Sequence, residues 1–126
     1  MNRKNVTLKA LLVLAFLLFA HVLTAQVRYE KGALYGIFVG ANGTDVVSVD
    51  NQGNVVVQKA EAANPSQYWQ VEELSGSVRL VNPFRHLAIR SDEDGLLKAA
   101  EINGSDEAQL WKLVDTKQGV ALLPTN

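Results

Sequence analysis

Short apolar runs rich in β-branched residues recur along most of the chain, and clusters of Gly, Asn, Asp and Pro separate them. Their spacing of roughly 8–12 residues is typical of an all-β domain, while helical periodicity is hard to find. The pattern therefore predicts nine strands, near residues 34–39, 46–49, 55–58, 68–72, 78–81, 87–90, 96–99, 110–114 and 120–123.

Turn sequences with a glycine separate several of these strands. Asn51-Gln52-Gly53 and Asp92-Glu93-Asp94-Gly95 place Gly where a tight hairpin needs a positive φ. Asp50 and Asp92 are expected to begin these turns, because an Asp side chain accepts hydrogen bonds from the backbone that follows it. Longer connections are predicted over residues 60–66 and 102–108.

The strands form an internal repeat. Trp69 and Trp111 are the only Trp residues, lie 42 residues apart (111 minus 69), and each follows Gln and one further residue. The same offset pairs Asp50 with Asp92 and matches apolar strand positions with one another. A constant period of about this size indicates a fold built from repeated supersecondary units. We place repeat one at about residues 34–75, repeat two at 76–117 and a partial repeat three at 118–126.

Units of four strands that close with Gln-x-Trp resemble the ricin-type (Gln-x-Trp) β-trefoil family, which is common among carbohydrate-binding modules. The residues that carry the resemblance are Asn64-x-x-Gln67-x-Trp69, Asp106-x-x-Gln109-x-Trp111 and the opening Gly32-x-x-Tyr35-x-Ile37. The resemblance runs from Lys31 to the C-terminus. It implies an all-β, β-trefoil-like fold in one domain over residues 26–126, with two complete four-stranded repeats and the start of a third.

The chain departs from the family at its third unit. A trefoil has three units and twelve strands, whereas nine strands are predicted here and the third unit has no Gln-x-Trp. Three explanations stay open: the chain is truncated, another molecule completes the unit, or the fold is an open relative of the trefoil. The exposed edges of an unfinished barrel would favour pairing with other chains.

The first 25 residues have the pattern of a targeting segment. Three basic residues precede an unbroken apolar run over residues 10–20, and Leu23-Thr24-Ala25 offers a signal-peptidase site. The run is shorter than the roughly 20 residues that span a bilayer. We expect a signal peptide over residues 1–25 and a secreted or periplasmic protein, with an uncleaved N-terminal anchor helix as the alternative.

Composition narrows the possible partners. Cleavage after Ala25 would remove three of the 12 basic residues and none of the 13 acidic ones, which gives a net charge of −4 (9 minus 13). Mild acidity argues against nucleic acid and anionic membranes, since both attract clustered Lys and Arg. The absence of Cys excludes disulfides and a lipidated cysteine anchor.

The repeated Trp and Gln residues have predicted structural roles. Trp69 and Trp111 are expected in the core, where each buried indole N–H needs a backbone partner; stacking against a ligand is the alternative. Gln67 and Gln109 are expected to tie the long connection to its strand. In lectins of the resembling family the equivalent polar residues also reach sugar hydroxyls, so the resemblance implies a second role.

The sugar pockets implied by the resemblance are degenerate. Binding members carry an Asp on the second strand and an aromatic ring on the third, but Ser48 and Arg90 stand near the Asp position and neither third strand has a ring. Tyr68 is expected to point away from the core and to supply a replacement stacking surface. The candidate carbohydrate-binding residues are Asp50, Asn64, Gln67 and Tyr68 in the first unit, and Asp92, Asp106 and Gln109 in the second.

No catalytic residue, metal site or cofactor is predicted. An EF-hand loop that began at Asp92 would have Asn103 at its twelfth position, where calcium loops have Glu. His86 is the only His after residue 25, and neither Cys nor a Ser-Asp pattern accompanies it. Glu72 and Glu73 alternate across a strand and do not converge as glycosidase carboxylates do.

The sequence therefore predicts an exported, non-catalytic, lectin-like module that binds glycans. The alternative is a protein-interaction or scaffold β-trefoil that binds an extracellular protein, and a protease inhibitor is a third class. Neither nucleic acid nor, after signal cleavage, a membrane is an expected partner. Weak pockets gain affinity when several act together, so a homo-oligomer is one expected assembly.

Overall fold

The computed structural model describes residues 27–40, 43–117 and 119–125, which contain nine β-strands and two 3-10 turns. The first repeat holds β1 (Phe38–Val39), β2 (Asp45–Val49), β3 (Val55–Lys59), the turn η1 (Pro65–Gln67) and β4 (Gln70–Leu74). The second holds β5 (Ser77–Asn82), β6 (Leu87–Ser91), β7 (Leu97–Glu101), the turn η2 (Glu107–Gln109) and β8 (Trp111–Thr116), and β9 (Gly119–Pro124) follows it. All nine predicted strands are confirmed, and the fold is all-β as predicted.

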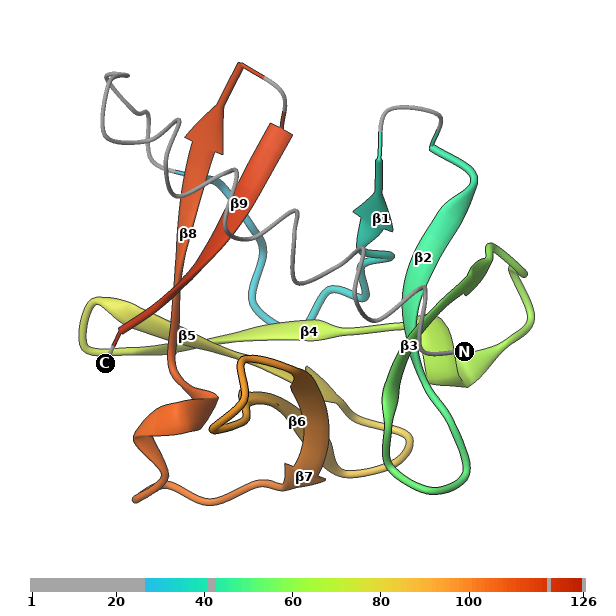
Figure 1. Cartoon of the computed structure of the whole chain (residues 1–126). Coiled ribbons are helices and arrows are strands. Elements are labelled where there is room, and N and C mark those ends of the chain that lie inside the picture. Colours follow the sequence, from blue (N-terminus) through green and yellow to red (C-terminus); the bar gives the residue numbers. More distant parts are fainter. Residues whose placement is uncertain (1–26, 41–42, 118, 126) are drawn as a thin grey trace.

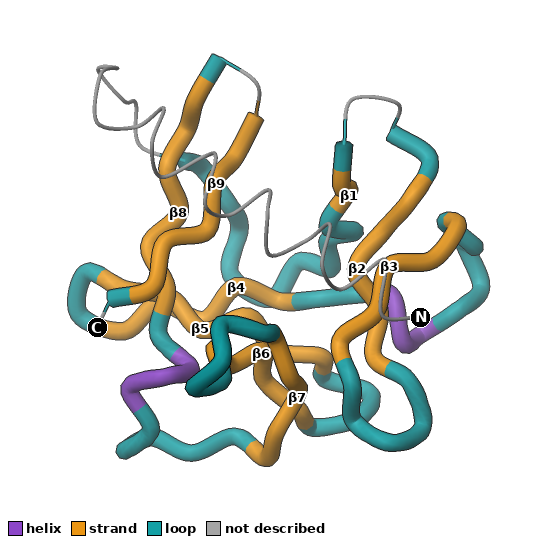
Figure 2. Tube along the Cα trace, viewed as in Figure 1, coloured by secondary structure: helices purple, strands orange, loops and turns teal. Residues whose placement is uncertain are grey.

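The strands form two antiparallel sheets. One has the order β1-β2-β3, and the other has the order β7-β6-β5-β8-β9, with β4 paired to β5. The β2–β3 and β6–β7 hairpins have the same register, since Val47 faces Val57 and Ile89 faces Ala99. Figure 1 shows β4 and β5 crossing the middle of the molecule, with β2–β3 to the right and β6–β7 below. One 3-10 turn accompanies each repeat (Figure 2).

The predicted hairpin turns are confirmed in both repeats. The Asp50 amide donates to the Asn54 carbonyl (2.9 Å), and the Asp92 amide donates to the Leu96 carbonyl (2.7 Å). The glycine that follows three residues after each Asp has a φ of 80°, a conformation that other residues adopt at a cost. The turn sequences therefore fix where each hairpin reverses.

The two Trp side chains fill equivalent positions in the core, and each is 0% exposed. The Trp69 indole Nε1 donates to the Val47 carbonyl (3.1 Å), and the Trp111 Nε1 donates to the Ile89 carbonyl (3.0 Å). Each acceptor lies on the second strand of the same repeat. The predicted core role is confirmed, and the rings pack in one cluster with apolar residues that include Val49, Val55, Leu80, Leu97 and Leu122.

The first strand of each repeat departs from the 42-residue offset. Phe38 pairs with Val46, and Val81 pairs with Ala88, so equivalent first-strand positions lie 43 residues apart (81 minus 38). The cause is loop length, because five residues separate β1 from β2 and four separate β5 from β6. The offset expected from the sequence holds from the second strand onward.

The first strand also changes partner along its length, which makes β1 shorter than the strand predicted over residues 34–39. Tyr35 forms an isolated bridge with Trp69: its amide donates to the Trp69 carbonyl (2.8 Å) and its carbonyl accepts from the Trp69 amide (2.9 Å). At Phe38 the chain pairs with β2 instead. The first strand therefore forms no continuous ladder with either the Trp69 segment or β2.

The fourth strand of each repeat lies between two first strands. In the first repeat, Trp69, which immediately precedes β4, pairs with Tyr35, and β4 itself pairs with β5. In the second repeat, β8 pairs with Val78 of β5 through Trp111 and with β9. Within the described residues the third repeat consists of β9, and both β9 and β1 are terminal strands of their sheets. This part of the chain leaves the barrel open between β9 and β1.

The predicted signal peptide, residues 1–25, lies outside the described residues. In the ranges that the structure describes, no helix has the length and apolar character needed to cross a membrane. Since the chain has no cysteine, packing and hydrogen bonds hold the repeats together without disulfides.

Replacing either Trp with Ala should lower the free energy of unfolding by roughly 3–5 kcal/mol, because a large cavity forms in the core. Urea denaturation followed by circular dichroism measures this change. Phe84→Ala is the control, since Phe84 is 53% exposed and its loss should change stability by less than about 0.5 kcal/mol. Wild-type stability in Trp69→Ala or Trp111→Ala would contradict the core assignment.

Candidate functional site

A polar side chain caps the 3-10 turn that precedes each Trp. Asn64 Oδ1 accepts from the Ser66 amide, and Asp106 Oδ1 accepts from the Ala108 amide, both at 3.0 Å. These bonds satisfy a backbone N–H that the short turn leaves without an internal partner. The two candidate residues at equivalent positions therefore each use one side-chain oxygen to hold the connection.

Gln67 and Gln109 tie the long connection to the preceding strand, as predicted. Gln67 Oε1 accepts from the Glu61 amide (2.8 Å), and its Nε2 donates to the Lys59 carbonyl (3.0 Å). Gln109 makes the equivalent bonds to the Asn103 amide (3.1 Å) and the Glu101 carbonyl (2.7 Å). Both residues are buried: Gln67 is 3% exposed and Gln109 is 1% exposed. A sugar contact by either side chain would require the connection to open, which makes both residues structural.

Arg85 joins two parts of the first repeat that are distant in sequence. Its Nη1 donates to Ser66 Oγ (3.2 Å), and its Nη2 donates to the Asp50 carbonyl (3.3 Å). Asn82, fully buried at the end of β5, orients the β5–β6 loop that carries Arg85. Its Oδ1 accepts from the Arg85 amide (2.9 Å), and its Nδ2 donates to the Pro65 carbonyl (2.9 Å). The second repeat thus supplies the side chain that completes the surface of the first.

Asp50 holds the turn beside this arginine. Its Oδ1 accepts from the amides of Gln52 (2.9 Å) and Asn54 (2.8 Å), and its Oδ2 accepts from Asn54 Nδ2 (3.2 Å). Partial burial acts to raise the pKa of Asp50, but the hydrogen bonds from Asn54 and Gln52 outweigh it and hold the pKa below its usual range. The carboxylate is half-buried and ionised at neutral pH.

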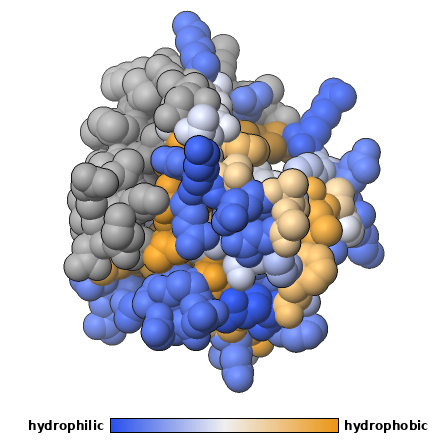
Figure 3. All heavy atoms as spheres, turned by 90° about the vertical axis from the view of Figure 1, so that its right-hand side faces the viewer, coloured by the Kyte–Doolittle hydropathy of each residue, from blue (hydrophilic) through white to orange (hydrophobic). Residues whose placement is uncertain are grey.

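Tyr68 adjoins the same connection. It is half-buried between the buried Gln67 and Trp69, as expected from strand alternation, and its hydroxyl donates to the Ala62 carbonyl (2.5 Å). We define the first-repeat cluster as Asp50, Asn64, Ser66, Tyr68 and Arg85. The face of the molecule that carries the first repeat is mostly hydrophilic, with an apolar strip along one side (Figure 3).

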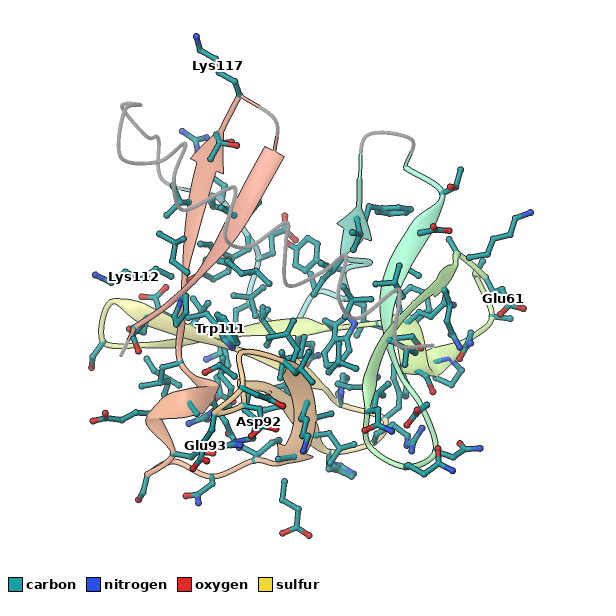
Figure 4. The ribbon with its side chains drawn as sticks, viewed as in Figure 1. Glu61, Asp92, Glu93, Trp111, Lys112 and Lys117 are labelled. Atoms are coloured by element: carbon teal, nitrogen blue, oxygen red, sulfur yellow. The ribbon has the colours of Figure 1, made fainter. Side chains whose placement is uncertain are left out.

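The second repeat places paired charges at the equivalent position. We define the second-repeat cluster as Arg90, Asp92, Lys98 and Asp106. Arg90 Nε donates to Asp106 Oδ2 (3.1 Å), and Lys98 Nζ lies 2.9 Å from Asp92 Oδ2. Figure 4 shows Asp92 at the β6–β7 end of the molecule and Trp111 in its interior. The aromatic ring of Tyr68 has no counterpart here, because the equivalent residue is Leu110.

These pairs lower the pKa values of both aspartates. The hydrogen bond from Lys98 is the main cause that holds the pKa of Asp92 below its usual range, and the hydrogen bond from Arg90 does the same for the pKa of Asp106. Asp92 also begins its turn and accepts from the Glu93 amide (2.9 Å). Two cations and two carboxylates therefore neutralise each other in the second-repeat cluster.

Neither cluster brings a nucleophile beside a base. Ser66 Oγ accepts from Arg85, and Ser48 Oγ donates to the Ser66 carbonyl (3.3 Å). His86 is exposed in the β5–β6 loop with a φ of 54°. Among the described residues, no group of three or more His, Cys, Asp or Glu side chains is placed to hold a metal ion.

Sequence reasoning missed Ser66, Arg85 and Lys98 as members of these clusters, and Asn82 as the residue that orients the loop carrying Arg85. Arg85 and Asn82 belong to the segment Asn82-Pro83-Phe84-Arg85-His86, whose composition indicates a loop and gives no sign of the partner that the loop contacts. Lys98 had a weak signal, since the hairpin register places β7 beside β6, and Arg90 pairs with Lys98 there. Contacts between repeats depend on the assembled barrel and leave no local pattern.

The chain is similar to solved β-trefoil structures. A designed threefold symmetric protein, ThreeFoil, matches with a TM-score of 0.62 and 20% identity over 72% of this chain and 71% of that chain. A Polyporus squamosus lectin, solved bound to a Neu5Acα2-6Galβ1-4GlcNAc epitope, matches with a TM-score of 0.57 and 9% identity over 79% of this chain. The match spans 46% of the lectin chain, which is less than half of its length. These similarities establish the β-trefoil fold, with two complete repeats and the start of a third.

No protein-family model and no curated protein matches the chain. Both solved structures share a low identity with it, so the likeness concerns the fold. A likeness of fold does not by itself locate a functional site on this chain.

Arg90→Gln should raise the pKa of Asp106 toward its usual range, because the guanidinium hydrogen bond is the main cause of its lowering. Carboxyl NMR titration measures this change, and the pKa of Asp50 is the internal control, since Asn54 and Gln52 hold it. A folded pKa below the unfolded value of about 3.9 stabilises the protein above that pH, and the stabilisation is lost as pH falls through the folded pKa. An unchanged pKa of Asp106 in the variant would contradict the pairing.

Proposed function

We propose that the protein is an exported, non-catalytic, ricin-type β-trefoil module that binds carbohydrate through its first repeat. The observation that carries the proposal is that Arg85, from the second repeat, donates to Ser66 in the connection of the first repeat and to the Asp50 backbone carbonyl, with the half-buried Tyr68 two residues after Ser66. The lectin among the similar structures supports a glycan as the ligand class. The repeated Gln-x-Trp motif supports the ricin-type assignment.

The first-repeat cluster offers the chemistry that sugar recognition needs. Arg85 uses two of its five N–H donors in the bonds described above, which leaves donors for hydroxyl oxygens. The Asp50 carboxylate accepts from sugar hydroxyls, and the Tyr68 ring packs against the apolar face of a sugar. Asn64 shapes the turn that carries these groups and offers its amide nitrogen. Because the third strands supply no stacking ring, the site is expected to bind at about millimolar Kd, near −4 kcal/mol.

The second-repeat cluster has a lesser role in the proposal. Asp92 and Asp106 are engaged by Lys98 and Arg90, and a ligand would have to compete with these ion pairs. Useful affinity then requires several first-repeat sites on one assembly, such as a homo-oligomer on a glycan-coated surface. Export, which the pattern of the N-terminal segment predicts, would bring the module to extracellular glycans after signal cleavage.

The second candidate function is a protein-interaction module that keeps the fold without a working sugar pocket. The specific observation in its favour is Arg90, which stands near the position of the Asp expected in sugar-binding relatives and pairs instead with Asp106. A module of this class is expected to bind an extracellular protein through its strand edges or loops. A protease-inhibitor role has no comparable feature in its favour.

A glycan array probed with the multimerised exported protein tests the proposal. We expect binding signals that Tyr68→Ala reduces by about tenfold or more, as for other aromatic hot spots. Tyr68→Phe, which keeps the ring and loses the hydroxyl, should retain most of the signal. Leu110→Ala is the matched control, because Leu110 occupies the equivalent position in the second repeat.

Two results would contradict the glycan proposal. A blank array from protein that retains its thermal unfolding transition would favour the interaction-module function. Equal losses of signal in Tyr68→Ala and Leu110→Ala would mean that the first-repeat cluster is not the binding site.

A further inference from the structure

The β5–β6 loop, residues 83–86, carries an exposed aromatic ring directly beside the first-repeat cluster. Phe84 is 53% exposed and belongs to neither apolar core cluster of the described residues. Its neighbour Arg85 donates to Ser66 and to the Asp50 carbonyl, which holds the loop against the first repeat. Single exposed apolar residues are common on protein surfaces. This ring, however, adjoins a guanidinium that has donors to spare for a ligand.

The loop lies at the same end of the β4–β5 ladder as the connection of the first repeat. Gln70 faces Val81 in this ladder, so the residues just before β4 and those just after β5 continue it in the same direction. Tyr68 precedes β4 by two residues, and Phe84 follows β5 by two. Figure 1 shows the β5–β6 loop reaching toward β3 and the turn that follows β2. Two aromatic residues therefore come from segments that meet at one end of the ladder.

Hydrogen bonds fix the backbone of this loop. The buried Asn82 side chain accepts from the amides of Phe84 (3.0 Å) and Arg85 (2.9 Å). The same side chain donates to the Pro65 carbonyl (2.9 Å) in the first repeat. His86 has a φ of 54°, in the left-handed region, and leads the chain into β6. A loop held in one conformation has less entropy to lose on binding, so the position of Phe84 is preorganised while its ring stays exposed.

An oligosaccharide matches this arrangement of polar groups beside an aromatic ring. One sugar unit has hydroxyl oxygens that accept from the remaining Arg85 donors. The next unit presents an apolar C–H face, against which an aromatic ring buries a large area. Consecutive Cα atoms are about 3.8 Å apart, so the Phe84 ring is within reach of a sugar that is bonded to one held by Arg85.

We propose that Phe84 forms a second aromatic subsite, and that the ligand is an oligosaccharide of at least two units. One unit binds the first-repeat cluster, and the next packs against the Phe84 ring. The inference rests on the proposed function, because the first-repeat cluster positions the first unit. It gives the second repeat a part in binding through its β5–β6 loop, while the second-repeat cluster stays outside the site.

A glycan array that carries monosaccharides and oligosaccharides built from the same sugars tests the subsite with the multimerised exported protein. We expect at least one oligosaccharide to bind about tenfold more strongly than its terminal monosaccharide. Phe84→Ala should remove this difference and leave the monosaccharide signal unchanged, whereas Phe84→Tyr should keep both. Ile102→Ala is the matched control, because Ile102 is also an exposed apolar residue (41%) and lies in the connection between β7 and η2.

The outcomes separate the subsite from the proposed function. Wild-type oligosaccharide binding by Phe84→Ala would overturn the subsite and leave the proposed function standing. Equal losses on monosaccharides and oligosaccharides would also overturn it, because the ring would then contact the same sugar as the first-repeat cluster. Tyr68→Ala, by contrast, should lower both signals. A blank array from wild-type protein that retains its thermal unfolding transition would overturn the proposed function and the subsite together.

Discussion

The rest of the structure depends on how each repeat buries one indole. A buried N–H without a partner costs about 1–3 kcal/mol, so each Trp must lie where a carbonyl of the second strand is free to accept. Val47 and Ile89 supply these carbonyls at 3.1 and 3.0 Å. Each bond holds the start of the fourth strand beneath the second strand. The long connection that leads into the fourth strand must therefore fold back over a fixed distance. The capped 3-10 turn and the buried Gln two residues before the Trp are the solution that both repeats use.

The two repeats share this framework and differ in the side chains that it presents. In the first, Ser48 is small and neutral, and Arg85 reaches over from the second repeat to Ser66 and the Asp50 carbonyl. In the second, Arg90 occupies the position of Ser48 and pairs with Asp106, while Lys98 pairs with Asp92. The same backbone thus carries a site with available donors in one repeat and a self-neutralised ion cluster in the other. This contrast is why the proposed glycan site lies in the first repeat.

The features that depend on local sequence pattern were predicted correctly from the sequence. The strands, the two turns at Asp50 and Asp92, the buried Trp residues and the tying role of the Gln residues all follow from periodicity, turn chemistry and the 42-residue repeat. The sequence did not predict the extra residue before β2, because loop length is invisible to an offset measured on later strands. Arg85 and Asn82 were missed because their partners belong to the other repeat.

The central claim is that both repeats are built on an equivalent, buried indole-to-carbonyl hydrogen bond. Hydrogen exchange of the two Trp indole N–H groups, followed by NMR at a series of low urea concentrations, tests it most directly. The account predicts two strongly protected indole signals that exchange only through global unfolding, with the same free energy and the same dependence on urea. Rapid exchange of either indole in the folded protein, or protection of one repeat without the other, would contradict it.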